Sequence, residues 1–151
     1  NGEFNTPVGK RDFNNSLRKN LKNFIAKLKT KNIEFVNSDF REFAIEAKEN
    51  TLVYCDPPYF LGTASYNENG GWTKQDEIDL LNYLFILDSK GIKFALSNVI
   101  EHKGATHEML EAWIREHHYT IHHITCDYNN SNYHKQDGNV TKTIEVLITN
   151  Y

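Results

Sequence analysis

The sequence has little of what marks a membrane protein, a disulfide-rich protein or a nucleotide-binding P-loop protein. Its 151 residues include only two cysteines, three prolines and eight glycines. No apolar run approaches the roughly 20 residues that span a bilayer. Cys55 and Cys126 lie far apart, so we expect buried free thiols in a reducing compartment. Because neither G-x-G-x-x-G nor a P-loop is present, a nucleotide-like ligand would lack its usual glycine cradle here.

The seven histidines do not form a metal-binding pattern. His117-His118 and His122-His123 are adjacent pairs, and the side chains of neighbouring residues diverge on a helix or a strand. No cysteine or carboxylate completes a zinc spacing beside them. We therefore expect no metal site.

The charge of the chain is unevenly distributed. The composition, with 39% hydrophobic and 25% charged residues, is that of an ordinary globular domain, and the net charge is -3. Between residues 10 and 31, however, the sequence contains eight basic residues and a single acid, Asp12. The basic residues are Lys10, Arg11, Arg18, Lys19, Lys22, Lys27, Lys29 and Lys31. Such a cluster can contact a nucleic-acid backbone or form the solvated face of a helix, and the sequence leaves both open.

The hydrophobic pattern predicts helices alternating with strands. Helices are expected over residues 16–30, 40–48, 73–89 and 106–116, and strands over 33–37, 51–55, 92–96, 119–126 and 143–149. In the third helix we expect Thr73 as the N-cap, Ile78, Leu81 and Phe85 facing inward, and Gly91 closing the element.

This alternation favours an α/β protein with a mostly parallel sheet. The last two strands have no helical pattern between them, so they are expected to pair antiparallel at one edge. They are joined by a polar loop over residues 127–140, which is long enough to suggest a binding role.

Polar side chains follow three of the predicted strands. They are Asp39, the segment Asp56–Tyr59, and the pair Ser97-Asn98. In open α/β sheets ligands bind outside the carboxyl ends of the strands. The sequence therefore predicts a site where these three segments meet.

The segment Asp56-Pro57-Pro58-Tyr59 has a chemistry of its own. Proline fixes its φ at about −65° and pushes the preceding residue into extended geometry. The Asp56 carboxylate and the Pro57 carbonyl could then be two fixed acceptors, which suit the two donors of an NH2 group. Tyr59 offers a face on which a planar ring can stack. The pattern indicates a pocket for an aromatic amine, with a proline-rich turn as the plainer alternative.

Such a pocket could also activate the amine. An amine conjugated to a purine ring is a poor nucleophile because its lone pair is delocalised. Fixed acceptors that pull the nitrogen toward tetrahedral geometry localise this pair and stabilise the positive charge that develops on it.

The motif and its surroundings resemble a known family. Val53-Tyr54-Cys55-Asp56-Pro57-Pro58-Tyr59 is similar to motif IV of the amino-group methyltransferases, which use S-adenosylmethionine. The rest of the chain resembles the Dam-type (D12 class) DNA adenine-N6 methyltransferases. Residues 1–10 resemble the G-E-F-N-x-P-x-G segment that closes the DNA-reading hairpin, and residues 37–40 the strand-end motif beside the cofactor's adenine. Residues 96–98 resemble the S-N pair, and residues 142–151 the closing strand with E-x-L-I.

The resemblance implies a partial Rossmann-like, S-adenosylmethionine-dependent methyltransferase fold. This chain would supply the third to seventh strands of a seven-stranded sheet. Residues 1–13 would end a DNA-recognition hairpin, and residues 14–151 would be the C-terminal part of the catalytic domain. The protein would act on double-stranded DNA in the cytoplasm of a bacterium, or be encoded by a phage.

The resemblance also assigns residues. The expected catalytic residues are Asp56, Pro57, Pro58 and Tyr59, which hold and stack on a flipped-out adenine. The expected cofactor-binding residues are Asp39, Phe40, Asp56 and Tyr59, and the expected DNA-binding residues are Lys10, Arg11, Asn130, Asn132 and Lys135. Each has a plainer alternative: a helix cap and a core aromatic for Asp39 and Phe40, and solvated loops for the DNA-binding residues. Ser97 and Asn98 would either shape the pocket or serve as turn residues.

The sequence departs from the family at one important place. The F-x-G-x-G segment beneath the cofactor's methionine part, the acid for its ribose, and the helical target-recognition region have no counterpart. The chain opens on Asn1-Gly2 without an initiator methionine. We therefore expect part of a longer enzyme, inactive and weak in cofactor binding by itself, that needs an N-terminal segment or a partner chain carrying F-x-G-x-G.

Two other functions remain open from the sequence alone. The same loop serves enzymes that methylate RNA bases or a protein glutamine amide. A chain without F-x-G-x-G could also be a non-catalytic DNA-binding half of a split enzyme.

Overall fold

The computed structural model describes residues 13–43, 45, 48, 50–61, 71–124 and 143–151. These residues separate into two compact units, one ending at Ser38 and the other beginning at Asp39. No helix in the described ranges is long and apolar enough to cross a membrane.

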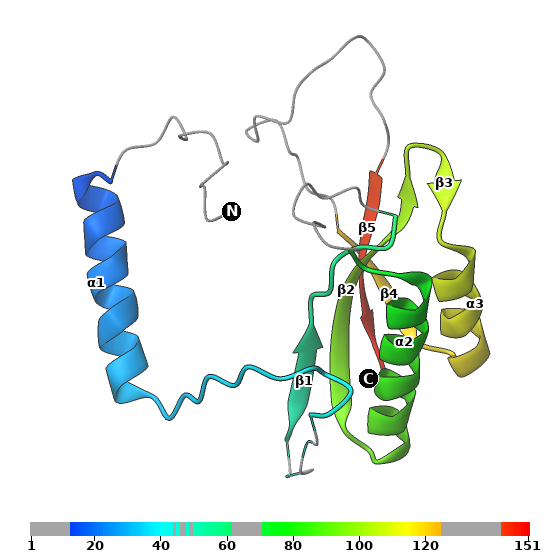
Figure 1. Ribbon diagram of the computed structural model, residues 1–151, viewed down its shortest axis with the longest axis horizontal. Coiled ribbons are helices and arrows are strands. Elements are labelled where there is room, and N and C mark those ends of the chain that lie inside the picture. Colours follow the sequence, from blue (N-terminus) through cyan, green and yellow to red (C-terminus); the bar gives the residue numbers. More distant parts are fainter. Residues whose placement is uncertain (1–12, 44, 46–47, 49, 62–70, 125–142) are drawn as a thin grey trace, which may run out of the picture. The chain divides into compact units, whose positions relative to one another are not determined.

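The first unit is built on helix α1, Asn15–Thr30 (Figure 1). The Asn14 side chain caps it by accepting a hydrogen bond from the Leu17 N–H at 3.0 Å, and lysines in the last turn suit the helix dipole. This matches the predicted helix. None of its side chains is fully buried within the unit.

The strand expected over residues 33–37 is not formed. These residues pair with no strand in the described part of the chain, and Phe35 is 80% exposed. The expectation was wrong because a strand needs a ladder partner for its backbone groups, and side-chain alternation alone does not provide one.

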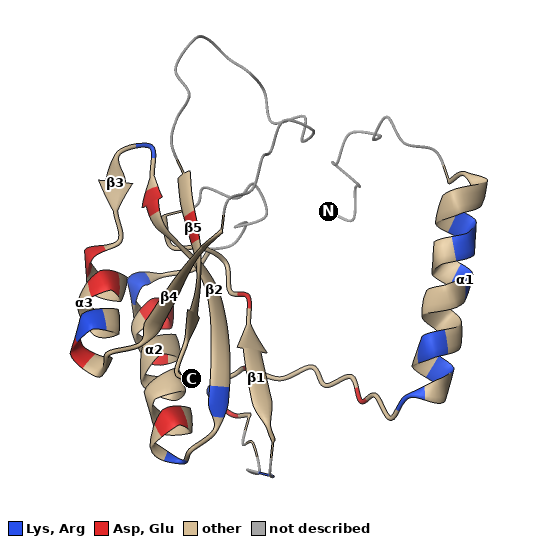
Figure 2. Ribbon diagram, turned by 180° about the vertical axis from the view of Figure 1, so that it is seen from behind, with Lys and Arg blue, Asp and Glu red and all other residues tan. Residues whose placement is uncertain are grey.

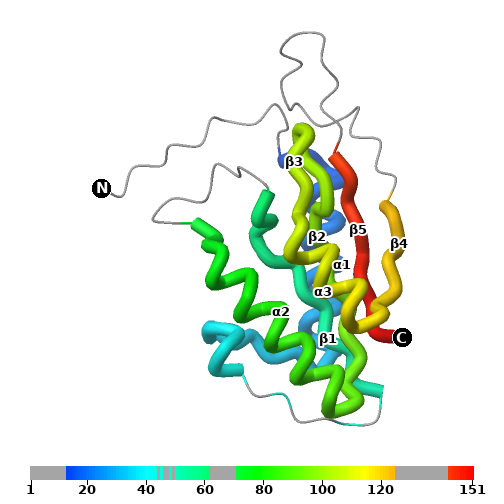
Figure 3. Tube along the Cα trace, turned by 90° about the vertical axis from the view of Figure 1, so that its right-hand side faces the viewer, coloured from blue at the N-terminus to red at the C-terminus, as the bar shows by residue number. Residues whose placement is uncertain are grey.

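The second unit is a mixed α/β structure with one open sheet. The strands lie in the order β1 (Leu52–Cys55), β2 (Lys93–His102), β5 (Thr143–Thr149) and β4 (Thr120–Ile124). A two-residue strand, β3 (Ala105–Thr106), pairs with β2. Helices α2 (Lys74–Ser89) and α3 (Glu108–His117) lie on the same face of the sheet, as Figures 1 and 3 show from two sides.

The expected mostly parallel sheet is not confirmed among the described strands. Only β1 and β2 pair in parallel, whereas β2 with β5, β4 with β5 and β2 with β3 are antiparallel. The reason is that β5 lies between β4 and β2 and runs antiparallel to both of these neighbours. The predicted antiparallel pairing of the last two strands is confirmed, with β4 at the edge.

The core lies between the sheet and the two helices. Phe94 and Leu96 of β2 and Val146 and Ile148 of β5 have no exposed surface. They pack against helix side chains, which are Leu80, Leu81, Leu84, Leu87, Leu110, Trp113 and Ile114. The rings of Trp113 and Tyr119, which belong to the same core, lie at a centroid distance of 4.7 Å.

Helix α2 begins and ends as predicted but faces the core differently. Thr73 and Asp76 form a reciprocal capping box, and Gly91 follows the helix with φ +70°. Phe85, expected to face inward, is 44% exposed, and the buried positions are Glu77, Leu80, Leu81, Leu84 and Leu87. Apolar residues occur all around this helix, so periodicity could not select the buried face.

Two other predicted elements differ in extent. Strand β2 continues past residue 96 to His102, so Ser97 and Asn98 lie inside the strand and not at its end. Residues 39–43 form a single turn, with Glu42 N–H donating to the Asp39 carbonyl at 3.1 Å, where a longer helix was expected. Part of that expected helix lies outside the described residues, as does the loop over residues 127–140.

Candidate functional site

The Asp56–Tyr59 loop leaves the carboxyl end of β1, as the sequence predicted. Asp56 and Pro58 are exposed, whereas Pro57 and Tyr59 are half-buried. The Tyr59 hydroxyl donates to Asp56 Oδ1 at 3.4 Å. Burial, together with the nearby Asp56 carboxylate, raises the pKa of Tyr59 to about 12. Tyr59 is therefore a neutral phenol at physiological pH.

A pocket of about 220 Å³ opens beside this loop. Its wall is formed by Phe40, Cys55, Asp56, Pro57, Trp72 and Leu80. The rings of Phe40 and Trp72 lie 6.0 Å apart at an interplanar angle of 37°. An aromatic wall facing a carboxylate suits a planar ring that carries donor groups. Of the predicted residues, Phe40, Asp56 and Pro57 meet here, whereas Asp39 and Tyr59 do not line the pocket.

Asp39 belongs to an ion-pair cluster centred on Arg41. The guanidinium Nη1 lies 3.1 Å from Asp39 Oδ2, Nε lies 2.6 Å from Asp79 Oδ2, and Nη2 contacts Asp76. The same guanidinium stacks 4.6 Å from the centre of the Phe40 ring. Arg41 therefore fastens the Phe40 turn to the N-terminal end of α2. Sequence analysis missed Arg41, because its three partners are not adjacent to it in a recognisable motif.

The Arg41 cluster also sets the charge at the start of α2. Hydrogen bonds from Thr73, and then from Arg41, lower the pKa of Asp76 to about 2. Hydrogen bonds from Arg41 and Gln75 lower the pKa of Asp79 as well. Both groups are carboxylates at neutral pH, and Asp76, in the first turn, complements the positive end of the helix dipole.

Ser97 and Asn98 sit level with the loop although they are not at a strand end. The parallel register pairs Cys55 with Leu96, so the next residues of β2 lie beside Asp56 and Pro57. Ser97 Oγ hydrogen-bonds to the Tyr54 hydroxyl at 2.9 Å. Asn98 is fully buried and points the other way, toward α2.

A buried carboxylate beneath the pocket was not predicted. Glu77 of α2 has no exposed surface. Its oxygens contact the Trp72 indole N–H at 2.6 Å, the Asn98 amide at 3.0 Å and His107 Nε2 at 3.0 Å. Nothing in the sequence separates Glu77 from the exposed acids of the same helix, because its partners come from three other segments of the chain.

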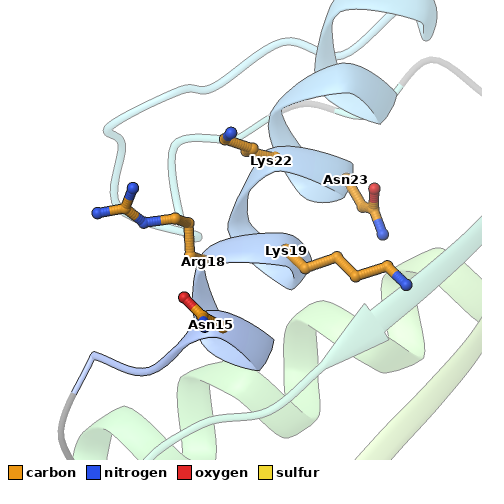
Figure 4. Close-up of a pocket in the computed structure, with 5 residues that line it drawn as sticks. All are labelled: Asn15, Arg18, Lys19, Lys22 and Asn23. Atoms are coloured by element: carbon orange, nitrogen blue, oxygen red, sulfur yellow. The ribbon is translucent and has the colours of Figure 1, made fainter.

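Helix α1 carries a separate, positively charged face. Its 16 residues include lysines and an arginine but no acid, and in Figure 2 its ribbon carries the colour of Lys and Arg and not that of Asp and Glu. A shallow hollow on this face is lined by Asn15, Arg18, Lys19, Lys22 and Asn23 (Figure 4). Amide and cationic donors spaced over two helical turns suit phosphate oxygens.

The remaining predicted residues cannot be placed. Lys10, Arg11, Asn130, Asn132 and Lys135 lie outside the described residues. Within the described ranges, no group of three or more histidine, cysteine or acidic side chains could hold a metal ion.

Comparison with known proteins gives a consistent family. The sequence model of the D12 class N6 adenine-specific DNA methyltransferases matches residues 1–130. The chain is 45% identical to the type II methyltransferase M.FokI of Planomicrobium okeanokoites, over 100% of this chain and 24% of that protein. It is 38% identical to the modification methylase StsI of Streptococcus sanguinis and 34% identical to the modification methylase LlaI of Lactococcus lactis subsp. lactis. Each of these two matches covers 99% of this chain and 23% of the relative.

Proposed function

The chain belongs to the D12 class N6 adenine-specific DNA methyltransferases, and we propose that it receives the target adenine of a modification enzyme that methylates DNA in the cytoplasm. It spans about a quarter of the length of the relatives reported above, so the proposal concerns the part that this segment contributes. The observation that carries it is the Asp56–Tyr59 loop at the end of β1, open to solvent beside an aromatic pocket.

In this proposal the loop binds the amine of a flipped-out adenine. Asp56 and the Pro57 carbonyl accept its two N–H bonds, and Pro58 holds the loop in extended geometry. Tyr59, a neutral phenol at physiological pH, offers a ring for stacking. Acceptance by the Asp56 carboxylate stabilises the positive charge that develops on the nitrogen as it is methylated.

The pocket beside the loop fits part of S-adenosylmethionine. The Phe40 and Trp72 rings would flank its adenine, and the Asp56 and Tyr59 end of the loop would border its methionine end. When bound, this cofactor supplies an electrophilic methyl group. Asp39 would act through Arg41, which fastens the Phe40 turn. The pocket of about 220 Å³ is smaller than a typical cofactor site, so we propose that an F-x-G-x-G segment, in the same polypeptide or in a partner chain, completes it.

Two groups of residues are proposed to contact double-stranded DNA. Lys10 and Arg11 would contact phosphates at the base of the recognition hairpin (residues 1–13), and Asn130, Asn132 and Lys135 would face the duplex from the long loop. The charged face of α1, with Arg18, Lys19 and Lys22, is a further candidate for backbone contact. Residues 14–151 would form the C-terminal part of the catalytic domain.

The proposal is tested by Asp56→Ala in the complete enzyme. We expect methyl transfer to duplex DNA to fall by at least about 10²-fold, because a preorganised acceptor at the reacting nitrogen is lost. DNA affinity, measured by fluorescence anisotropy, should change by less than about twofold, since Asp56 carries no phosphate contact. Glu111→Ala, which removes a carboxylate on the surface of α3, is the matched control and should leave both quantities unchanged. Turnover retained by Asp56→Ala would refute the assignment.

The substrate class is tested in the same assay. Duplex DNA, single-stranded RNA and a glutamine-containing peptide are offered at equal concentration with labelled cofactor. Label in N6-methyladenine of the duplex supports the proposal, whereas label only in RNA or peptide would replace it by one of the two alternatives.

A further inference from the structure

Glu77 joins three segments of the chain, of which two lie 21 and 30 residues away in sequence. Trp72 precedes α2, Asn98 lies in β2, and His107 caps α3, yet all three side chains reach the same buried carboxylate. Burying a charge is costly unless hydrogen bonds satisfy it. All buried side-chain polar atoms in the described part of the chain have a partner. The cluster is therefore a complete polar network inside an apolar core.

The hydrogen-bond partners orient the donors of the cluster. His107 Nδ1 accepts the Leu110 N–H at 3.3 Å, so its proton lies on Nε2 and points at Glu77 Oε1. The Asn98 carbonyl oxygen accepts the Val99 N–H at 2.8 Å, which orients its NH2 group toward the same oxygen. The two oxygens of Glu77 thus meet three N–H donors, from Trp72, Asn98 and His107.

Two links connect this network to the proposed catalytic loop. On one side, Trp72 donates to Glu77 and its ring forms part of the pocket wall with Asp56 and Pro57. On the other side, the ring of Phe60 lies 5.2 Å from the ring of His107. Phe60 directly follows Tyr59, so its position sets where the loop leaves the site. Glu77 is hydrogen-bonded to both Trp72 and His107.

We propose that Glu77 is a positioning residue for methyl transfer, acting through Trp72 on the pocket wall and through His107 and Phe60 on the Asp56–Tyr59 loop. This rests on the proposed function, because it assigns Glu77 a task in the reaction and not only in folding. In this proposal, loss of one hydrogen bond to Glu77 shifts Trp72 or the Asp56–Tyr59 loop, which together border the substrate.

The test is Glu77→Gln in the complete enzyme, in which an NH2 group replaces one acceptor and opposes the N–H donors. The rate constant of methyl transfer in a single turnover, with cofactor and DNA both saturating, is expected to fall about 10²-fold, as for a misplacement of about 1 Å. DNA affinity should stay within about twofold of wild type. Trp72→Phe removes the indole N–H, and with it the five-membered ring of this pocket-wall side chain, and should lower the same rate constant by about tenfold.

Two comparisons separate positioning from stability. Tyr119→Phe removes a different partly buried hydrogen bond of α2, the 3.1 Å bond from the Tyr119 hydroxyl to Asp88, and should lower Tm without changing the single-turnover rate. The double variant Glu77→Gln/Trp72→Phe should be less slow than the product of the two single effects, because both changes act on the bond between Glu77 and Trp72.

Defined outcomes overturn the proposal. A Glu77→Gln enzyme that folds and transfers methyl at the wild-type rate would refute the positioning role of Glu77. If that variant does not fold, an unchanged rate constant in Trp72→Phe would refute it instead. Neither result touches Asp56→Ala, whose loss of transfer tests the proposed function separately.

Discussion

Cys55 lines the pocket, so the reactivity of its thiol can be used to measure how buried the pocket wall is. Burial raises the pKa of its thiol from 9.0 to about 11, so the reactive thiolate fraction near pH 8 falls about 100-fold. We expect iodoacetamide to alkylate Cys55 about 100-fold more slowly in the folded enzyme than after unfolding in urea. Peptide mass spectrometry of the segment containing Cys55 measures both rates. Equal rates in the two states would contradict the burial of this thiol.

Variants at Tyr59 can distinguish the contribution of its ring from that of its hydroxyl group. Its bond to Asp56 is long, at 3.4 Å, and contributes little, whereas stacking on a base contributes about 1–3 kcal/mol. We therefore expect Tyr59→Phe to lower the single-turnover rate by less than about threefold, and Tyr59→Ala to lower it by about 5- to 150-fold. Rapid-quench assays of both variants make this comparison. If Tyr59→Phe proved as slow as Tyr59→Ala, the hydroxyl and not the ring would be the essential part.

The raised pKa of Tyr59 adds a pH expectation. A pKa raised above its unfolded value means that the folded protein favours the neutral phenol. This contribution to stability is fully present below the ordinary tyrosine pKa of about 10 and is lost as the pH rises toward 12. The activity ratio of Tyr59→Phe to wild type should accordingly stay constant between pH 7 and 9.

At the scale of elements, helix α2 depends on its N-terminal cap. Thr73 Oγ1 accepts the Asp76 N–H at 3.2 Å, while the Asp76 carboxylate accepts the Thr73 N–H at 2.7 Å. Thr73→Ala should lower the free energy of unfolding by about 1 kcal/mol. Ser89→Ala, at the exposed end of the same helix, is the control and should have almost no effect. Urea unfolding at pH 7 measures both.

The cap also has a predictable pH dependence. The pKa of Asp76 is lowered to about 2, so the stabilisation it provides is present above about pH 4 and is lost as the pH falls toward 2. The difference in stability between wild type and Thr73→Ala should therefore shrink over this range. A difference that stayed constant down to pH 2 would show that the Asp76 side of the capping box contributes nothing.

The charged face of α1 can be tested through salt. Removing two phosphate contacts with Lys19→Gln/Lys22→Gln should reduce the slope of log affinity against log salt by about 1.8, since each contact contributes about 0.9. Lys27→Gln/Lys29→Gln removes the same charge from the last turn of the helix, outside the hollow, and serves as the control. Titrations of duplex DNA between 50 and 200 mM salt, roughly the range over which such slopes are measured, compare the two. Equal slopes for both variants would argue against a specific role for the hollow.

The elements that sequence predicted are those specified by local signals. The cap at Thr73, the left-handed glycine at Gly91 and the apolar run before Asp56 each lie within a few residues of the feature they determine. The strand predicted over residues 33–37 was wrong because a strand depends on a hydrogen-bonding partner elsewhere in the chain. The buried face of α2 failed because its apolar residues surround the helix, and only packing against β2 selects one side.

The site divides in the same way. The proposed catalytic loop could be recognised because Asp56, the two prolines and Tyr59 are contiguous. Arg41 and Glu77 could not be, because each has partners that lie far away in sequence, such as Asn98, 21 residues from Glu77, and Asp79, 38 residues from Arg41. Contacts of that kind appear only once the sheet and the helices are assembled.

For the whole molecule, the position of β1 is the decisive feature. Strand β1 pairs only with β2 among the described strands, and the candidate site lies at its carboxyl end. One side of the site is therefore built by α2, β2 and the Phe40 turn, whereas the other backbone edge of β1 offers ladder groups for a further strand. In the proposed function, a segment with F-x-G-x-G completes the pocket at the carboxyl end of this strand.

This proposal predicts how cofactor affinity depends on the length of the polypeptide. The 151-residue chain should bind S-adenosylmethionine with a Kd weaker than about 1 mM, since aromatic contact alone rarely exceeds a few kcal/mol. A polypeptide that also contains F-x-G-x-G should bind at least about tenfold more tightly, because the glycine turn adds backbone donors to the methionine end. Isothermal titration calorimetry on the two proteins decides the matter, with Trp72→Ala in the longer one as the control for binding at this pocket. Tight binding by the 151-residue chain alone would show that its own residues complete the site.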